Sequence, residues 1–150
     1  MNGWLLDTNV LAELAKPHGT KRVQAWAAAQ DEALLFLSIL TLGEYDKGLN
    51  NLPPDSPVRP GIAAGIAALE ARFTDRVLPL TDPIVRRWGT IRGLVKRQVG
   101  HAPPVIDTML AATAIEHDLC LVTRNTRDVR YSGATFLNPW EPDEGSRSAR

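Results

Sequence analysis

The chain has 150 residues and a mass of 16.4 kDa, which corresponds to one domain of ordinary size rather than two. Hydrophobic residues make up 44% and charged residues 23% of the sequence, as in globular domains and unlike disordered, collagenous or coiled-coil chains. The 17 basic and 17 acidic residues cancel, which excludes the bulk positive charge of many nucleic-acid-binding proteins but leaves local patches open.

The only cysteine and the N-terminal residues indicate the cellular compartment. Cys120 lies alone within an apolar run, so the sequence predicts neither an internal disulfide nor a zinc site built from cysteines. The first seven residues, Met-Asn-Gly-Trp-Leu-Leu-Asp, have no basic flank and no long apolar stretch, which fits neither a signal peptide nor a membrane helix. We therefore expect a cytoplasmic protein with no membrane contact.

Short apolar runs alternate with longer segments in which apolar residues recur at helical spacing. The short runs are the predicted strands: 4–6, 34–38, 77–80, 119–123 and 134–137. The longer segments are the predicted helices: 9–16, 20–29, 40–51, 61–73, 83–99 and 104–117. This alternation predicts a three-layer α/β domain, in which helices flank a central, mostly parallel sheet.

All of these elements fall within residues 1–140, which are predicted to form the single domain. The segment 53–60 holds four prolines and is expected to be an exposed connection between two helices, not a domain boundary. The tail 141–150 lacks a large apolar side chain that could anchor it, so we expect it to be mobile.

The first candidate site residues follow the first strand. Ligands of open α/β sheets bind at the carboxyl ends of the strands, so polar residues at those ends are of most interest. Asp7 comes directly after the first run, and Thr8 and Asn9 supply a hydroxyl and an amide that could orient its carboxylate. Asp, Thr and Asn are also good helix N-caps, so a purely structural role for Asp7 stays open.

Two further acids stand near the starts of predicted helices. Glu44 lies three residues after Thr41, which is also the spacing of a capping box, and a structural role is common for such an acid. Asp107 has almost only small and apolar neighbours. An unpaired carboxylate in a core costs on the order of several kcal/mol, so Asp107 is expected to face a polar cavity or a partner.

The fourth run ends in another group of polar side chains. Thr123 and Asn125 lie nearest to the strand, whereas Asp128 carries the charge that a metal site favours, and the sequence does not decide between Asn125 and Asp128. A salt bridge from Asp128 to Arg124 or Arg127 is the structural alternative. Acids that converge on one cleft repel each other unless a cation neutralises them, and oxygen ligands select hard ions such as Mg²⁺ or Mn²⁺.

Five short motifs follow one another across about residues 4–140. They are Leu5 to Val10, Leu37 to Glu44, Asp107 with the segment 110–114, Leu121 to Asn125, and Asn138-Pro139-Trp140. In this order and spacing they resemble the PIN-domain ribonuclease toxins of bacterial toxin–antitoxin pairs, the VapC type. The resemblance extends over nearly the whole chain and implies the PIN fold.

The resemblance also implies an activity, in which Asp7, Glu44 and Asp107 bind Mg²⁺ or Mn²⁺ and support the hydrolysis of RNA. The family often has a fourth acid after the Thr-Arg pair, where this chain has Asn125, and Asp128 is the expected replacement as ligand and catalytic acid. Thr123 resembles the family's hydroxyl near the metal. A neutralising antitoxin and a homodimer are further implications.

Other functions remain open. The stretch 86–97 carries five basic side chains that could contact RNA, although a solvated helix face explains them as well. A phosphatase-like hydrolase with Asp7 as nucleophile fits poorly, because position 9 is Asn rather than a second acid. A PIN-like nuclease of RNA processing that is not a toxin, and an inactive module that binds ligands through an acidic pocket, are the remaining alternatives.

Overall fold

The computed structural model describes residues 1–142 and 147–148, and within them the chain forms one sheet of six strands in the order β3-β2-β1-β4-β5-β6. The strands are β1 (Trp4–Leu6), β2 (Leu35–Ser38), β3 (Val77–Leu78), β4 (Cys120–Val122), β5 (Thr135–Leu137) and β6 (Arg147–Ser148). β1 to β5 are parallel, and β6 is antiparallel to β5 at the edge. The five strands expected from the apolar runs are confirmed, and β6 is an addition.

The six expected helices are also present, each with ends within two residues of the predicted ones. They are α1 (Thr8–Ala15), α2 (Lys21–Ala28), α3 (Ile39–Asn50), α4 (Arg59–Arg72), α5 (Asp82–Val99) and α6 (Val105–Glu116). The sequence did not predict α7 (Thr126–Val129) or the 3₁₀ turn η1 (Glu32–Leu34). Both are too short to show a helical period in the sequence.

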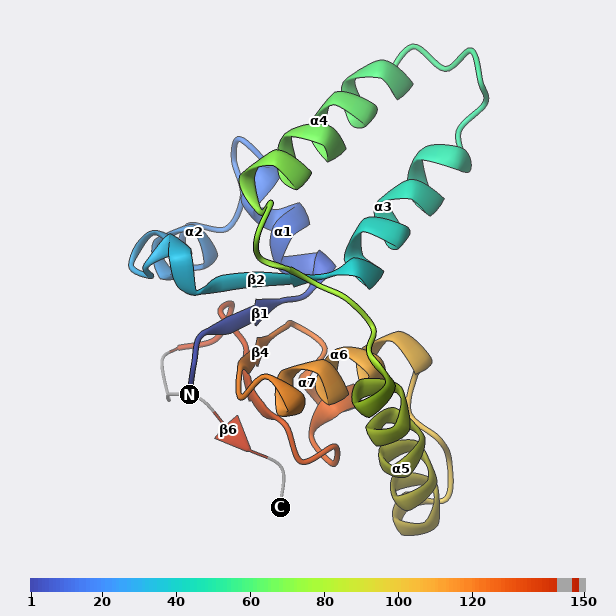
Figure 1. Cartoon of the computed structure of the whole chain (residues 1–150). Coiled ribbons are helices and arrows are strands. Elements are labelled where there is room, and N and C mark those ends of the chain that lie inside the picture. The colour runs from blue at the N-terminus through green and yellow to red at the C-terminus, as the bar shows by residue number, and fades with distance from the viewer. Residues whose placement is uncertain (143–146, 149–150) are drawn as a thin grey trace.

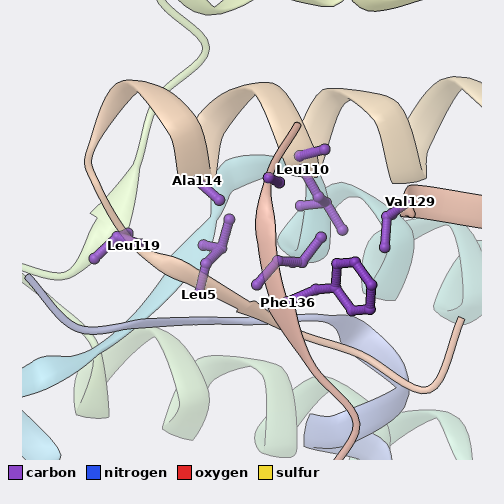
Figure 2. Packing of buried hydrophobic residues seen from close by; sticks show 9 residues of the cluster. Leu5, Leu110, Ala114, Leu119, Val129 and Phe136 are labelled. Atoms are coloured by element: carbon purple, nitrogen blue, oxygen red, sulfur yellow. The ribbon is translucent and has the colours of Figure 1, made fainter. Parts of the chain in front are cut away.

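The helices form the two outer layers predicted for the domain (Figure 1). Helices α1 to α4 lie on one side of the sheet, and α5 to α7 lie on the other. Side chains alternate between the two faces along a strand, so neighbouring residues of β1 belong to different cores. Leu6 packs with Val10 of α1 and Val23 of α2, whereas Leu5 packs with Leu110 and Ala114 of α6 (Figure 2).

Helix α6 is enclosed on two sides, which explains its small and apolar sequence. It packs on the sheet through Leu110 and on α5 through Met109, which contacts the cluster of Ile84 and Ile91. Every residue from Thr108 to Ala114 is buried. The enclosed helix holds the residue before this stretch, Asp107, in a fixed place at the carboxyl-terminal edge of the sheet.

Helices α3 and α4 form a hairpin that extends away from the sheet (Figure 1). The exposed connection predicted for residues 53–60 is confirmed, except that α4 already begins at Arg59. Pro60 then lies in the first turn, where a proline costs no hydrogen bond. The Arg59 guanidinium closes the connection by donating to the Leu52 carbonyl at 3.1 Å and to Asn50 Oδ1 at 2.9 Å.

Two remaining predictions concern the tail and the membrane. Residues 143–146 and 149–150 of the tail lie outside the described residues, so its expected mobility stays a prediction; Arg147 and Ser148 pair with Phe136 and Thr135 of β5. In the part of the chain that is described, no helix combines the length and apolarity needed to cross a membrane.

Candidate active site

A cavity of about 410 Å³ opens at the carboxyl ends of β1 and β4, beside the first turns of α1 and α6. We call it the acidic cavity; its lining residues are Asp7, Thr8, Asn9, Ala12, Glu44, Ile106, Asp107 and Asn125. Three acids that are far apart in the sequence therefore meet in one place. β1 and β4 are neighbours in the sheet, and this adjacency brings the start of the chain next to residues beyond 120.

Asp7 is almost completely buried, with 5% of its surface exposed, and four groups of the protein hold it. Its backbone N–H donates to the Val122 carbonyl at 2.9 Å. Its Oδ1 accepts from the Thr8 N–H at 2.7 Å, while its Oδ2 accepts from the Thr123 hydroxyl at 2.7 Å and from the Asn9 amide at 3.3 Å. Asp7 is the N-cap of α1 and also lines the cavity, so the structural role proposed for it is real and does not exclude a chemical one.

Burial raises the pKa of Asp7 above its ordinary value of 3.8. The hydrogen bonds from Thr123 and Thr8 act in the opposite direction, because they stabilise the charged form, and the nearby charge of Glu44 raises the pKa further. The hydrogen bonds thus fix the orientation of the carboxylate, but they do not fully offset the effect of burial on its charged form.

Thr123 links the two strands that form the cavity. The residue follows β4 and is buried, and its hydroxyl donates to Asp7 while accepting from the Asn125 N–H at 2.9 Å. A single side chain therefore sets the position of Asp7 relative to the segment that leads into α7.

Glu44 reaches the cavity from α3. The N-cap of α3 is Ser38, whose hydroxyl oxygen accepts from the Leu40 N–H at 3.1 Å, so Glu44 lies in the second turn. The capping box with Thr41 is therefore wrong as an explanation of Glu44. The Thr8 hydroxyl instead donates to Glu44 Oε1 at 2.9 Å and lies 3.3 Å from the Thr41 hydroxyl, which holds the carboxylate at the start of α1.

Asp107 is the residue most strongly affected by the other acids. It lies in the first turn of α6, as expected, and its pKa is raised from 3.8 to about 6. Burial is the largest cause, followed by the negative charges of Asp7 and Asp128, while the neighbouring Asn125 amide opposes them and Glu44 adds a smaller increase. The acids are close enough to repel each other, and a bound cation would relieve that repulsion.

The structure places Asn125 and Asp128 differently. Asn125 lines the acidic cavity, whereas Asp128 lies on α7 and lines a neighbouring one. The charge of Asp128 still acts on Asp107. No ion pair joins Asp128 to Arg124 or Arg127, so the structural alternative for Asp128 is not formed.

The oxygen donors of the acidic cavity suit a hydrated divalent cation. Among the described residues, no three acidic, histidine or cysteine side chains are arranged to hold a metal ion by themselves. Mg²⁺ needs fewer than three such side chains, because it binds through one or two carboxylates and keeps several water molecules as its other ligands. The carboxylates of Asp7 and Asp107 with the amide oxygen of Asn125 provide such a set, and a bound cation would oppose the burial and the neighbouring negative charges that raise the pKa of Asp107.

The basic stretch 86–97 contributes less to a nucleic-acid surface than its composition indicates. Arg87 Nε pairs with Glu116 Oε1 at 2.6 Å, and Arg92 donates to the Pro103 carbonyl at 3.1 Å while lying over the Trp88 ring. At least two of its five basic residues therefore hold α5 in place, Arg87 against α6 and Arg92 against the connection that precedes α6. The sequence analysis considered Arg127 only as an ion-pair partner of Asp128 and did not mention Arg130; Arg127 of α7 and Arg130, which follows that helix, both line the neighbouring cavity, and no sequence pattern marks them.

Comparisons with known proteins relate the chain to one family. The model of the PIN domain matches residues 4–133. The chain is 31% identical over 149 residues to the VapC ribonuclease Y4jK of Sinorhizobium fredii, a match that covers 92% of this chain and 98% of that protein. It is also 31% identical over 139 residues to toxin FitB of Neisseria gonorrhoeae, with 91% and 97% covered.

Solved structures show the same fold. The crystal structure of FitAcB from Neisseria gonorrhoeae superposes with a TM-score of 0.83 at 28% identity, covering 93% of this chain and 99% of that one. The structure of FitAB bound to the IR36 DNA fragment gives a TM-score of 0.81, also at 28% identity, with 94% and 98% covered. The matched residues 4–133 include every residue that lines the acidic cavity, and the chain belongs to the PIN domain family.

Proposed function

We propose that the protein is a metal-dependent ribonuclease that acts as the toxin of a toxin–antitoxin pair. The observation that carries the proposal is the meeting of Asp7, Glu44 and Asp107 in one cavity, where they repel each other without a cation. The similarity to a VapC ribonuclease and to toxin FitB supports both the nuclease activity and the role as a toxin.

In this proposal, Asp7, Asp107 and Asn125 hold Mg²⁺ or Mn²⁺, and Glu44 faces the same cavity from α3. When bound, such an ion neutralises the acids, stabilises negative charge on the phosphate oxygens and activates water for attack on the phosphodiester. Thr123 and Thr8 keep the carboxylates of Asp7 and Glu44 in place through their hydroxyl hydrogen bonds.

The proposal moves the fourth ligand from Asp128 to Asn125. Asp128 contributes by its negative charge, which strengthens the attraction for a cation from a site outside the acidic cavity. An amide oxygen adds no charge, so the cavity holds three acids rather than four. Fewer charges favour one tightly held ion, and a second ion would need further oxygen ligands, which the phosphate of RNA could supply.

The geometry argues against the phosphatase-like alternative. A nucleophilic aspartate must reach the substrate phosphorus, and such chemistry uses a second acid close behind it. Asp7 is almost completely buried, and Asn9 stands where that second acid would be and donates its amide to Asp7 Oδ2 at 3.3 Å. The surroundings of Asp7 therefore lack the acid that a covalent phosphatase mechanism needs.

The activity is tested with the purified chain and labelled single-stranded RNA. We expect cleavage with Mg²⁺ or Mn²⁺, none with EDTA, and a loss of several orders of magnitude for Asp107→Asn. Asp46→Asn is the matched control, because Asp46 is an exposed acid of α3 outside the acidic cavity. Full cleavage by folded Asp107→Asn contradicts the proposal, whereas RNA binding without cleavage by the wild type supports the inactive binding module.

A second cavity, which is mostly apolar, is the surface on which we expect the antitoxin to bind. About 600 Å³ of space lies between α1, α2 and α4, lined by Leu11, Leu14, Ile62, Ile66 and Leu69 among others. The matched chains in the FitAcB structure and in the structure of FitAB bound to a DNA fragment have the fold of this chain. We infer that an amphipathic helix of an antitoxin occupies this groove, and that an arginine of the antitoxin pairs with the acids of the site.

Co-expression tests the partner. The chain alone should arrest growth, and the small protein encoded beside its gene should bind it and restore growth. Ile62→Glu places a charge in the groove and should abolish rescue while ribonuclease activity remains; Leu94→Glu, on the exposed side of α5, is the control. An active nuclease that is not toxic and has no neutralising neighbour would indicate an RNA-processing enzyme. The homodimer remains a prediction, and sedimentation of the purified chain tests it.

A further inference from the structure

We propose that a pocket beside the acidic cavity binds the nucleotide next to the scissile phosphate of a single-stranded RNA. This inference rests on the proposed ribonuclease function and names its substrate contact. We call this space the arginine pocket. It has a volume of about 170 Å³ and lies between the end of α5, the start of α6 and α7; the polar residues that line it are His101, Arg127, Asp128, Arg130, Tyr131 and Ser132.

The two cavities are neighbours along two elements of the chain. Pro104 lines the arginine pocket, and Asp107 in the same turn of α6 lines the acidic cavity. On the other side, Asn125 lines the acidic cavity, and Arg127 two residues later lines the arginine pocket. A polynucleotide whose phosphate lies at Asp107 therefore has the arginine pocket directly beside it.

The charges of the arginine pocket suit a phosphate backbone. Arg127 and Arg130 are exposed, and neither forms an ion pair within the described part of the chain. Among the described residues, Asp128 is the only acid that lines the pocket, so the positive side chains there outnumber the negative one. In a chain of zero net charge, this local excess supplies the attraction that an acidic cavity lacks for RNA.

The pocket also offers a flat surface for a base. Tyr131 is 43% exposed, and the Arg130 guanidinium lies 4.8 Å from the centre of its ring. Unstacked RNA bases bind on aromatic rings and on guanidinium planes, and both are present here. Pockets for drug-sized ligands measure about 300–1,000 Å³, so a space of about 170 Å³ suits a single ring system.

These features select single-stranded RNA over an acidic peptide segment. A peptide carboxylate would use Arg127 and Arg130 but gain little from the exposed ring of Tyr131. A base inside a duplex is stacked on its neighbours and cannot reach Tyr131, so the strand must be single. The pocket thus recognises the shape and the charge of a nucleotide beside the cleavage position.

Binding without cleavage tests the inference. Asp107→Asn serves as the background for all variants, and a labelled single-stranded RNA is titrated without metal at several salt concentrations. Tyr131→Ala should weaken binding about tenfold with an unchanged salt slope, whereas Tyr131→Phe should bind like the background. Arg127→Ala with Arg130→Ala should weaken binding at least tenfold and reduce the slope of log K against log salt by about 0.7 per lost phosphate contact.

The matched control is Lys21→Ala with Arg22→Ala, two exposed basic residues of α2 outside the pocket, which should change binding less than twofold. Unchanged binding in the Tyr131→Ala and double-arginine variants overturns the inference. A loss with the arginines alone, and none with Tyr131→Ala, also overturns it, because it indicates a site for anions or acidic peptides rather than for a base.

Kinetics separate this inference from the proposed ribonuclease function. In the wild-type background with Mn²⁺, the pocket variants should raise KM more than they lower kcat, because the pocket holds substrate and does not touch the reacting phosphate. If RNA binding depends on Tyr131 but the chain never cleaves RNA, the proposed ribonuclease function is refuted and the nucleotide-binding role of the pocket is retained. Normal cleavage and normal KM in all pocket variants refute the pocket alone.

Discussion

The hydroxyl of Thr123 donates a hydrogen bond of 2.7 Å to Oδ2 of Asp7, and this contact joins two residues that are 116 positions apart. It ties the end of β4 to the end of β1 and keeps an almost fully buried carboxylate in one orientation. This contact therefore fixes the position of Asp7, the most buried acid of the acidic cavity.

Thr123→Val tests this contact, because valine keeps the shape and removes the hydroxyl. The change removes the shorter of the two hydrogen bonds to Asp7 Oδ2, which keeps the Asn9 amide at 3.3 Å, and it removes the acceptor of the Asn125 N–H, so we expect the free energy of unfolding to fall by about 1–3 kcal/mol. Ribonuclease activity should fall at least tenfold, and Thr123→Ser should restore both. Urea denaturation and cleavage assays measure the two effects; equal stability of the valine and serine variants would contradict the role of the hydroxyl.

Asp107 gives a pH-dependent prediction for the metal-free protein. Its pKa is raised from 3.8 to about 6, so between these values the folded chain keeps a proton that the unfolded chain has lost. Stability therefore falls as the pH rises through this window. Asp107→Asn cannot ionise and should match the wild type near pH 4 (about the unfolded pKa of Asp) and exceed it by about 1–2 kcal/mol above pH 6, allowing for solvent screening of a half-buried group.

Urea denaturation in EDTA at several pH values measures this difference. Asp46→Asn, the exposed control on α3, should follow the wild type at every pH. An Asp107→Asn protein that is less stable than the wild type at neutral pH would show that repulsion among the acids does not raise the free energy of the folded state.

Metal binding should reverse the order of stability. Mn²⁺ at a hundred times its Kd stabilises a folded protein by about 2.7 kcal/mol if the unfolded chain does not bind it. We expect this gain for the wild type and little of it for Asp107→Asn, measured as a shift in Tm. Equal shifts in the two proteins would place the ion elsewhere.

The fourth ligand is decided by comparing two variants in the same titration. Asn125 lines the acidic cavity and Asp128 does not, so Asn125→Ala should weaken Mn²⁺ binding more than Asp128→Ala does. Asp128→Ala should still have a measurable effect, because its charge reaches Asp107. The reverse order would return the role to Asp128, which carries the full charge that the sequence analysis favoured.

The fold could be predicted from the sequence because its main signals are periodic. Apolar runs such as 119–123 marked the strands, and the small, apolar segment after Asp107 indicated an enclosed helix, which α6 is. β6 and α7 were not predicted, because two or four residues carry no period and β6 owes its existence to its pairing with β5.

The acids could be found one by one, but their arrangement could not. Thr8 and Glu44 are 36 residues apart, and their hydrogen bond depends on how α3 packs beside the start of α1. The difference between Asn125 and Asp128 depends on the short helix α7, which turns Asp128 toward another cavity. Sequence spacing shows neither relationship, because both arise from tertiary packing.

Thr8 and Glu44 give the last prediction, which separates position from charge. Thr8→Val removes the hydroxyl that donates to Glu44 Oε1 but keeps the backbone N–H that donates to Asp7. We expect a loss of about 0.5–1.5 kcal/mol in the free energy of unfolding, since Glu44 is only partly buried and water can replace the hydroxyl. The value of kcat should fall more than KM rises, and Thr8→Ser should restore it.

Glu44→Gln is the complementary variant, because its amide oxygen can still accept from Thr8 while the negative charge is gone. If Glu44 acts through its charge on the ion, this variant loses more activity than Thr8→Val and binds Mn²⁺ more weakly. If Glu44 acts only by closing the cavity wall through Thr8, Glu44→Gln keeps near-normal activity and Mn²⁺ affinity. Cleavage kinetics and Mn²⁺ titration of the two variants, measured side by side, distinguish a carboxylate that takes part in the chemistry from one that shapes the cavity.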